Sequence, residues 1–334
     1  MRASVRTSAD GVLASRLSAL IGDAIAASGS VGVERRRSPY RSTHELEDVD
    51  LILGDGRRLP LVLKACGLAA THGVRPRIVM DGHRELWAYE TLFRRIEIGA
   101  PRFFGRLDLG PDGERLVLER IPGEPLHLVG GLDAWCATAR WLGRFHARGQ
   151  ERWGGVAASG RALSQDPSLH ERWLARSRRG AAVAGGAAAA AWSETIGDAA
   201  RRAIRILADS PRTLVHGEFY PSNVIVSRTG GDARIRVVDW ESIGVGPAAL
   251  DLAALTAGDW SESVRGALVR AYRSTAPDRI VDHPLFERSL DPARLVNALQ
   301  WLGWTEDWTA PPHQARDWHL EARTAAARIA AAEP

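Results

Sequence analysis

Oxygen-bearing side chains gather in two short segments of the C-terminal half. The first runs from His216 to Asn223 and contains Glu218, five residues before the asparagine. The second is an Asp-Trp-Glu segment that begins at Asp239. The residues between them read as two short strands around a glycine pair, so Asn223 and Asp239 flank one hairpin. Their oxygens can then converge on one cation, and Mg²⁺ prefers such hard oxygen ligands. In isolation Asn223 would be a turn residue and Asp239 a strand-end cap, whereas their joint spacing favours a cation site.

A third candidate lies far upstream. The chain has 44 lysine and arginine residues, and Lys64 is the only lysine among them. It ends the apolar run from Leu61 to Leu63. Lysine carries a compact point charge on a flexible stem, whereas arginine carries a broad planar fork. A single retained lysine therefore indicates a site that the fork does not fit, although Lys64 alone leaves chance as the alternative.

Together these segments resemble the catalytic and metal-binding loops of the protein-kinase-like fold. The form His-Gly-acid-x-x-Pro-x-Asn at 216–223, followed by Asp239-Trp240-Glu241, is similar to the aminoglycoside phosphotransferase family of small-molecule kinases. The segment from Gly244 to Ala253 matches the stretch that follows the metal aspartate in that family. Asp251 in it is expected to support the loop structurally. The resemblance spans roughly residues 60–255 in the expected order.

The resemblance implies a kinase that transfers the γ-phosphate of ATP, or of GTP, to a hydroxyl of a small molecule. It implies an α+β fold with a small antiparallel-sheet N-lobe and a mainly helical C-lobe. Glu218 would orient the acceptor hydroxyl, Lys64 would hold the α- and β-phosphates, and Asn223 and Asp239 would bind Mg²⁺. His216, which we group with these catalytic residues, would brace the loop by hydrogen bonds rather than act as a general base.

The nucleotide site is also implied by the resemblance. Glu85 matches the helix glutamate that pairs with the strand lysine, with Glu90 on the same helix as the alternative. The three residues that directly follow the strand at 116–118 match the hinge segment, whose backbone groups hydrogen-bond adenine. Ser42 lies where a loop covers the phosphates, although residues 38–43 contain no glycine. The implied nucleotide-binding residues are Lys64, Glu85, Glu119, Arg120, Ile121 and Ser42.

Glu218 departs from the family pattern, in which most members have Asp. The acid needs only to orient the hydroxyl, because positioning and electrostatics supply most of the acceleration, so the longer side chain can serve. The alternative is a catalytically impaired protein that binds nucleotide without transferring phosphate. Retention of Lys64, Asn223 and Asp239 favours the active kinase. A protein-substrate kinase is less favoured, because no Ala-Pro-Glu segment follows Asp239.

The acceptor pocket is expected in the C-terminal lobe. Its tryptophans suit sugar rings or flat natural products, with packing in the core as the alternative; they are Trp260, Trp301, Trp304, Trp308 and Trp318. A polycationic aminoglycoside would need acidic residues, of which Asp259, Glu262, Glu306, Asp307 and Asp317 are candidates. The net charge of +4 does not favour that acceptor. A sugar, an amino alcohol, an aminoglycoside or another natural product stays open.

Composition sets broader bounds. The chain is 45% hydrophobic and 25% charged, has no run of 18 apolar residues, and lacks a signal-peptide pattern, which predicts a cytoplasmic protein with no membrane partner. Cys66 and Cys136 have neither metal-ligand nor disulfide-framework spacing. The sequence pI is about 9.5. The arginines are scattered and no nucleic-acid-binding motif is present, so we predict a small-molecule acceptor and no nucleic-acid partner.

The elements expected to position these residues divide at Pro122-Gly123 into an N-lobe of residues 1–121 and a C-lobe of 122–334. The N-lobe pattern predicts helices over 10–28 and 81–95 and strands over 31–34, 45–53, 59–65 and 116–118. Pro60 lacks a backbone donor, which predicts a sheet edge or a bulge there. The C-lobe pattern predicts helices over 132–146 and 180–208, a hairpin around Gly230-Gly231, and a helical tail from Pro247.

Overall fold

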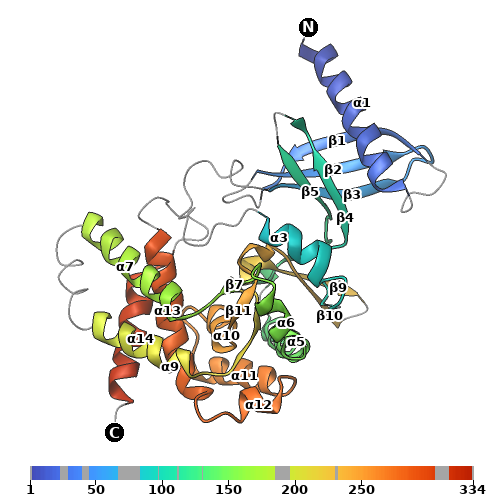
Figure 1. Ribbon diagram of the computed structural model, residues 1–334. Helices are drawn as coiled ribbons and strands as arrows, with labels where there is room; N and C mark the ends of the chain where they lie inside the picture. Colours follow the sequence, from blue (N-terminus) through green and yellow to red (C-terminus); the bar gives the residue numbers. More distant parts are fainter. Residues whose placement is uncertain are drawn as a thin grey trace.

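The N-terminal part of the chain forms a helix and a five-stranded antiparallel sheet (Figure 1). The computed structural model describes residues 2–22, 29–39, 45–66, 83–96, 98–110, 113–129, 131–184, 196–229, 232–304 and 316–332. The spatial strand order is β1-β2-β3-β5-β4. The strands are β1 (Ser30–Arg37), β2 (Leu46–Leu53), β3 (Arg58–Ala65), β4 (Phe103–Asp108) and β5 (Glu114–Glu119).

The two faces of this sheet differ because side chains alternate along each strand. One face presents Leu61 and Leu63 to a buried cluster that includes Leu17 of α1 (Arg2–Leu20). Lys64 follows Leu63 on the strand and therefore points to the opposite face, toward the remainder of the chain. The predicted N-terminal helix exists but begins earlier and ends at Leu20, and residues 23–28 of the prediction lie outside the described part.

The position of Pro60 differs from the predicted sheet edge or bulge. It lies in β3, which is an interior strand between β2 and β5, and not at a sheet edge. Its carbonyl accepts a hydrogen bond of 3.1 Å from the Arg120 amide, just beyond the paired residues Leu61 and Glu119. The nitrogen and the oxygen of a residue in an antiparallel strand face the same neighbouring strand, so the nitrogen of Pro60 also faces β5. This position lies beyond the last paired residues of β3 and β5, so the missing N–H removes no hydrogen bond between the two strands.

The helix expected over 81–95 is shorter and less regular than predicted. Its described part is α3 (Arg84–Trp87), followed by the π-helical turn η3 (Ala88–Leu92), a rare conformation. Tyr89 is buried in this turn, and its ring centroid lies 5.5 Å from that of Phe103 on β4. The two turns bury Glu85 and leave Glu90 exposed.

The rest of the chain is mainly helical, as predicted, with two small three-stranded sheets. The predicted hairpin is present as β9 (Val224–Thr229) paired with β10 (Asp232–Val237), while its two glycines lie outside the described residues. The other short strands are β6 (Glu124–Pro125), β7 (Leu163–Ser164), β8 (Arg212–Val215) and β11 (Gly244–Pro247). The helices are α4 (Leu126–Val129), α5 (Leu132–Gln150), α6 (Trp153–Ala158), α7 (Pro167–Ala184), α9 (Gly197–Ala208), α10 (Ala249–Leu255), α11 (Glu262–Arg273), α12 (Asp278–Val281), α13 (Leu290–Trp304) and α14 (Trp318–Ala331).

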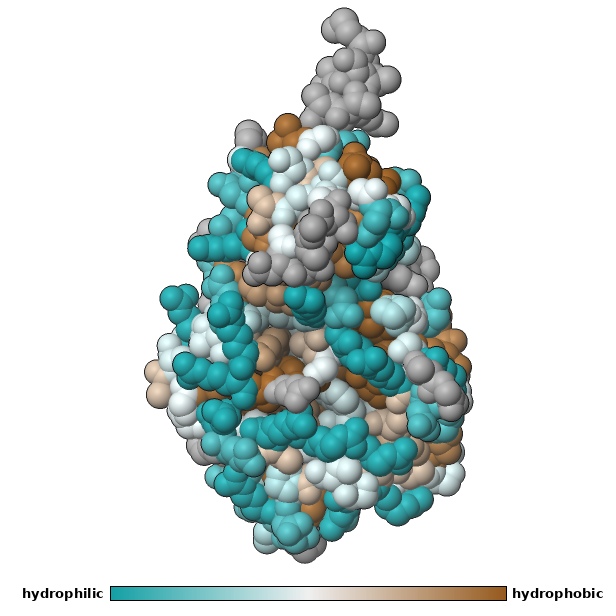
Figure 2. Space-filling model, turned by 90° about the vertical axis from the view of Figure 1, so that its right-hand side faces the viewer, coloured by the Kyte–Doolittle hydropathy of each residue, from teal (hydrophilic) through white to brown (hydrophobic). Residues whose placement is uncertain are grey.

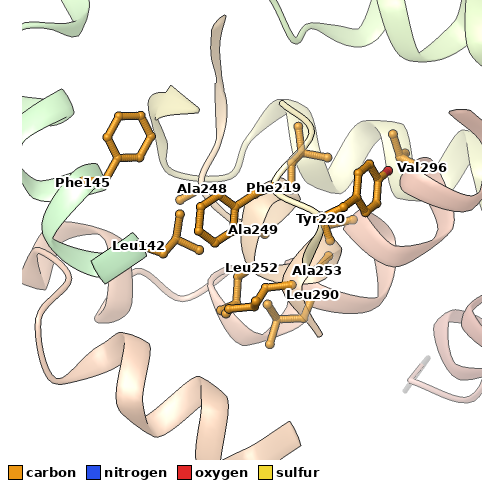
Figure 3. Packing of buried hydrophobic residues seen from close by; sticks show 14 of the residues in the cluster. Leu142, Phe145, Phe219, Tyr220, Ala248, Ala249, Leu252, Ala253, Leu290 and Val296 are labelled. Carbon is orange, nitrogen blue, oxygen red and sulfur yellow. The ribbon is translucent and has the colours of Figure 1, made fainter. Parts of the chain in front are cut away.

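One large buried cluster joins these helices to α3 and to the inner face of the sheet. Figure 3 shows part of it around two consecutive residues, Phe219 and Tyr220. Phe219 lies among the residues around Leu142 and Ala248, whereas Tyr220 extends toward Val296 of α13. Because its two aromatic side chains are buried in different directions, the loop that also carries Glu218 is held in place.

No helix in the described ranges is long and apolar enough to cross a bilayer. Both cysteines are free thiols. Burial, together with the nearby carboxylates, raises the pKa of the Cys66 thiol to about 11, so this group is protonated at neutral pH.

His170 on α7 is buried, and within the described part of the chain neither ring nitrogen has a hydrogen-bond partner. Burial lowers the pKa of His170 to about 4. Below pH 6.5 the unfolded chain binds a proton that the folded chain does not, so stability falls with decreasing pH. We expect His170 to account for a loss of about 2 kcal/mol in unfolding free energy between pH 7 and pH 5. Urea unfolding of His170→Leu should lack this component; an unchanged pH dependence would contradict the prediction.

Candidate active site

Lys64 joins two carboxylates that come from distant parts of the chain. Its Nζ lies 2.6 Å from Oε2 of Glu85 and 2.6 Å from Oδ1 of Asp239, which is 175 residues away in sequence. The lysine is 8% exposed. Burial by itself would lower the pKa of the ammonium, but the charges of Asp239 and Glu85 outweigh burial and raise the pKa above its usual range. The only lysine of the chain is therefore a buried, charged group between two anions.

The structure distinguishes the two candidate glutamates. Oε2 of Glu85 contacts Lys64, and its Oε1 accepts a hydrogen bond of 3.2 Å from the backbone amide of Trp240. Glu90 is exposed and lies 3.8 Å from Arg106. Burial raises the pKa of Glu85 while Lys64 lowers it, and the ammonium at 2.6 Å favours the charged pair. Glu85 is the partner of the strand lysine, as the sequence pattern favoured.

Asp239 has an unusual backbone. Its φ of 64° places it in the left-handed region, where it is the only described residue other than glycine with a positive φ. Such strain persists where the surrounding structure enforces it. Here the enforcement comes from Trp240, whose fully buried ring lies 4.5 Å from that of His216 and whose Nε1 donates to the Val237 carbonyl at 3.0 Å. Trp240 thus packs as a buried hydrophobic residue and holds the backbone that presents the Asp239 carboxylate.

The backbone of the loop at 216–223 is anchored by Asp251 on α10. The two oxygens of Asp251 accept hydrogen bonds from the amides of His216, at 2.7 Å, and Gly217, at 2.9 Å. His146 on α5 lies 3.2 Å from the same carboxylate and 2.8 Å from the Tyr272 hydroxyl. The supporting role predicted for Asp251 matches these contacts.

His216 uses both ring nitrogens within the fold. Its Nδ1 accepts a hydrogen bond from the Glu218 amide at 3.3 Å, so the proton is on Nε2, which lies 3.1 Å from the Val238 carbonyl. Burial lowers the pKa of the imidazole, which keeps the ring neutral. His216 therefore joins the Glu218 loop to the residue before Asp239, and its nitrogens have no access to a substrate proton.

Asn223 precedes β9 and Asp239 follows β10 after Val238, so the backbones of both residues lie at the open end of this hairpin. The backbone amide of Val238 donates to the Asn223 carbonyl at 2.9 Å. The side-chain Nδ2 of Asn223 donates to the Glu218 carbonyl at 3.0 Å, so the amide oxygen lies on the other side of the carboxamide. Within the described ranges no group of three or more His, Cys, Asp or Glu residues is arranged to hold a metal ion. One carboxylate and one amide oxygen nevertheless fit Mg²⁺, which keeps several waters and takes further oxygens from substrate phosphates.

Sequence reasoning missed one residue at this site. Nε2 of Gln300, on α13, lies 3.4 Å from Oε1 of Glu218 and donates to it. Gln300 is buried and its neighbours Leu299 and Leu302 are apolar core residues. A buried amide within an apolar helix is the signal that would have indicated a polar partner.

The hinge lies at the end of β5. The Glu119 amide donates to the Arg102 carbonyl at 2.8 Å, and the Arg120 amide donates to Pro60 at 3.1 Å. The Arg120 side chain pairs with Asp50 at 2.6 Å, and that of Glu119 pairs with Arg236 at 2.6 Å. Two of the three predicted hinge amides thus have partners within the fold. Among the described residues, the Ile121 amide has none.

The remaining nucleotide-site prediction concerns the phosphate loop. Ser42 lies outside the described residues. Ser38 is buried, and its amide donates to the Leu46 carbonyl at 3.0 Å, which extends the pairing of β1 with β2. Ser38 is therefore part of the sheet framework.

The tryptophans of the tail separate into different environments. Trp301 and Trp318 stack with centroids 5.0 Å apart, and Tyr220 meets Trp301 edge-on at 5.2 Å; we call these three the aromatic cluster. Trp304 packs on Trp173, and Trp260 packs on Trp135. Both pairs pack between elements of the fold, which is the packing alternative that the sequence left open. Trp308 is outside the described residues.

Two of the acidic candidates of the tail, Glu262 and Asp317, have partners within the described part of the chain. Glu262 pairs with Arg328, and Asp317 caps α14 by accepting from the Leu320 amide at 2.8 Å. Glu306 and Asp307 are outside the described residues. Within the described part of the chain, Glu262 and Asp317 are therefore engaged by partners of the fold itself.

Two surface cavities, of about 470 and 230 Å³, lie along α5 and share Trp141 and Arg144. None of the predicted site residues lines either of them. The chemistry-bearing groups lie instead where the N-terminal sheet meets the helical part. Figure 2 shows one face of the molecule, on which patches of hydrophobic surface lie between hydrophilic side chains.

An antiparallel sheet above a helical remainder, with a lysine, a glutamate and an aspartate joined where they meet, defines a protein-kinase-like phosphotransferase fold. The chain belongs to the phosphotransferase enzyme family, whose profile matches residues 62–282. No curated protein matches the sequence.

Solved structures with this fold include kinases and antibiotic phosphotransferases. The ethanolamine kinase of Plasmodium vivax is 13% identical, with a TM-score of 0.62 and coverage of 96% of this chain and 86% of that one. The macrolide 2'-phosphotransferase of Brachybacterium faecium is 18% identical, with a TM-score of 0.55 and coverage of 95% and 99%. An aminoglycoside 2'-phosphotransferase in complex with GDP is 13% identical, with a TM-score of 0.55 and coverage of 94% and 97%. At these identities the likeness establishes the fold. With the family match, it supports a small-molecule phosphotransferase.

Proposed function

We propose that the protein transfers the γ-phosphate of ATP to a hydroxyl group of a small molecule. The observation that carries this proposal is the pair of 2.6 Å contacts that Lys64 makes with Glu85 and Asp239. A buried lysine held by a glutamate on one side and an aspartate on the other is the arrangement that kinases use to hold phosphates next to a metal.

Each residue has a separate task in this proposal. Lys64 holds the α- and β-phosphates, and Glu85 orients it. The Ile121 amide donates to the purine ring at the hinge. Glu218 orients the acceptor hydroxyl and accepts its proton as the oxygen attacks the γ-phosphorus and the bond to the β-phosphate oxygen breaks. His216 holds the Glu218 loop against the backbone that precedes Asp239.

Asn223 and Asp239 are the residues that would hold Mg²⁺. The bound ion would supply positive charge against the phosphate oxygens. Asp239 contacts Lys64 directly, so the cation that holds the phosphates and the carboxylate that would hold the metal are adjacent.

The acceptor is an alcohol. Related folds act on ethanolamine and on macrolide and aminoglycoside antibiotics, as their names state, and all of these carry hydroxyl groups. Arg316 lies over the ring of Trp318 at 5.2 Å, which places a positive charge on the aromatic cluster near the Glu218 loop. This charge, together with the engagement of Glu262 by Arg328 and of Asp317 by the Leu320 amide, favours a neutral or weakly charged acceptor, such as a sugar or a neutral natural product, over a polycation.

Radiolabelled ATP and a panel of sugars, amino alcohols, aminoglycosides and macrolides would test the proposal. Transfer of label to at least one acceptor in the presence of Mg²⁺ is the expected result. Tight binding of Mg-ATP without transfer to any acceptor would instead identify a nucleotide-binding protein without catalytic activity.

Glu218→Gln should lower kcat for the accepted alcohol by about 100-fold, because the amide keeps the size of the side chain but cannot accept the proton. The affinity for Mg-ATP, measured by calorimetry, should change by less than about twofold, because Glu218 contacts no phosphate in this proposal. An unchanged kcat would remove Glu218 from the catalytic residues.

A further inference from the structure

Gln300 on α13 reaches the candidate catalytic acid from outside the loop that carries Glu218. Its Nε2 lies 3.4 Å from Oε1 of Glu218, and the residue is 6% exposed. We propose that Gln300 is a positioning residue that holds the Glu218 carboxylate in the orientation needed for phosphoryl transfer. This inference rests on the proposed function and adds to it a residue that acts through Glu218 and not on the substrate.

The hydrogen bond of Gln300 matters for stability because the side chain is buried. An amide removed from water is destabilising unless it is hydrogen-bonded, so a glutamine retained between core leucines indicates a required partner. Asn297 lies one turn earlier on the same side of α13, and its Nδ2 donates to the Leu250 carbonyl of α10 at 3.0 Å. Of these two buried amides, one ties the helix to its neighbour and the other reaches the candidate acid.

The distance between α13 and the loop is fixed by packing on both sides of this contact. Trp301, the residue after Gln300, meets the Tyr220 ring at 5.2 Å. Tyr220 in turn extends toward Val296 on the same helix (Figure 3). Asp251 holds the other end of the loop through the amides of His216 and Gly217. Gln300 therefore approaches Glu218 from a rigid support.

This support explains how a glutamate can serve where aspartate is usual in the family. The extra methylene adds one rotatable bond, so the carboxylate of Glu218 has more orientations to choose from than that of an aspartate. A donor on Oε1 restricts that choice. An aspartate at 218 would withdraw its oxygens by about one C–C bond length, roughly 1.5 Å, and a contact that already measures 3.4 Å would be lost. Gln300 and Glu218 should accordingly be coupled.

The test compares Gln300→Met with Gln150→Met. Both replace a buried glutamine by a side chain of similar size without a donor, and Gln150 donates to the Arg212 carbonyl at 2.9 Å, outside the proposed site. Gln300→Met should lower kcat by roughly 10- to 100-fold, because a misplaced reacting group loses rate. KM for ATP and the Mg-ATP dissociation constant should stay within about twofold, since no nucleotide contact is removed. Gln150→Met should leave kcat unchanged, whatever it does to thermal stability.

A double-mutant cycle separates positioning from a general effect on folding. In a Glu218→Asp background, Gln300→Met should lower kcat by less than about threefold, because the contact no longer exists. An equal loss in both backgrounds, or a wild-type kcat in Gln300→Met, would overturn the inference while leaving the proposed function intact. If the wild-type protein transfers no phosphate to any acceptor and does not hydrolyse ATP, the proposed function fails, and the positioning role fails with it.

Discussion

Asp239→Asn should lower phosphoryl transfer by about 1,000-fold or more while the fold is retained, because the change removes a charge that stabilises the metal and the transferring phosphate. Asparagine is also the substitution that this backbone tolerates, since Asp239 has φ of 64° and asparagine readily adopts the left-handed region. Loss of activity in this variant would therefore reflect lost charge and not a rearranged loop.

Two measurements would check this result. Calorimetry should show that Mg²⁺ no longer strengthens ATP binding, and circular dichroism should show an unchanged spectrum and a folded protein at the assay temperature. Asp232→Asn is a matched control, because Asp232 begins β10 and is exposed at the far end of the same hairpin. Activity of Asp239→Asn within tenfold of the wild type would remove Asp239 from the proposed metal site.

Lys64→Arg, a conservative change elsewhere in an arginine-rich chain, should lower turnover by about 100- to 1,000-fold with the fold intact. The lysine Nζ lies 2.6 Å from both Glu85 and Asp239 inside a buried site. The arginine fork is larger and bidentate, so it would engage the two carboxylates in a different geometry. Its positive charge would then lie further from the bound phosphates. The positive charge itself is preserved, which limits the loss of stability.

Lys64→Met provides the contrast. It removes the charge and leaves two neighbouring carboxylates without the ammonium between them, so it should destabilise the protein by about 3–5 kcal/mol in addition to inactivating it. Thermal unfolding and single-turnover kinetics on both variants would separate the two effects. Near-normal turnover in Lys64→Arg would mean that the position needs a positive charge and not a lysine.

Much of the candidate site could be predicted from sequence because its signals are local. The loop at 216–223, the hairpin that follows it and the Asp-Trp-Glu segment lie within about 25 residues, so short-range geometry brings Asn223 and Asp239 together. The pairing of Lys64 with Glu85 required a resemblance to a known pattern, since nothing local distinguishes Glu85 from Glu90. The π-helical turn that buries Tyr89 and exposes Glu90 has no signal in the local pattern.

The sequence by itself determined the residue types, their order and the fold class. These follow from local periodicity and from motifs whose spacing is set by the backbone. The tertiary structure alone decided three further points: that Pro60 occupies an interior strand, that Trp260 and Trp304 of the tail pack on other tryptophans, and that Gln300 contacts Glu218. Each depends on packing between elements far apart in the chain. Such packing is fixed by the complementary surfaces of whole elements, which the pattern within any single segment does not contain.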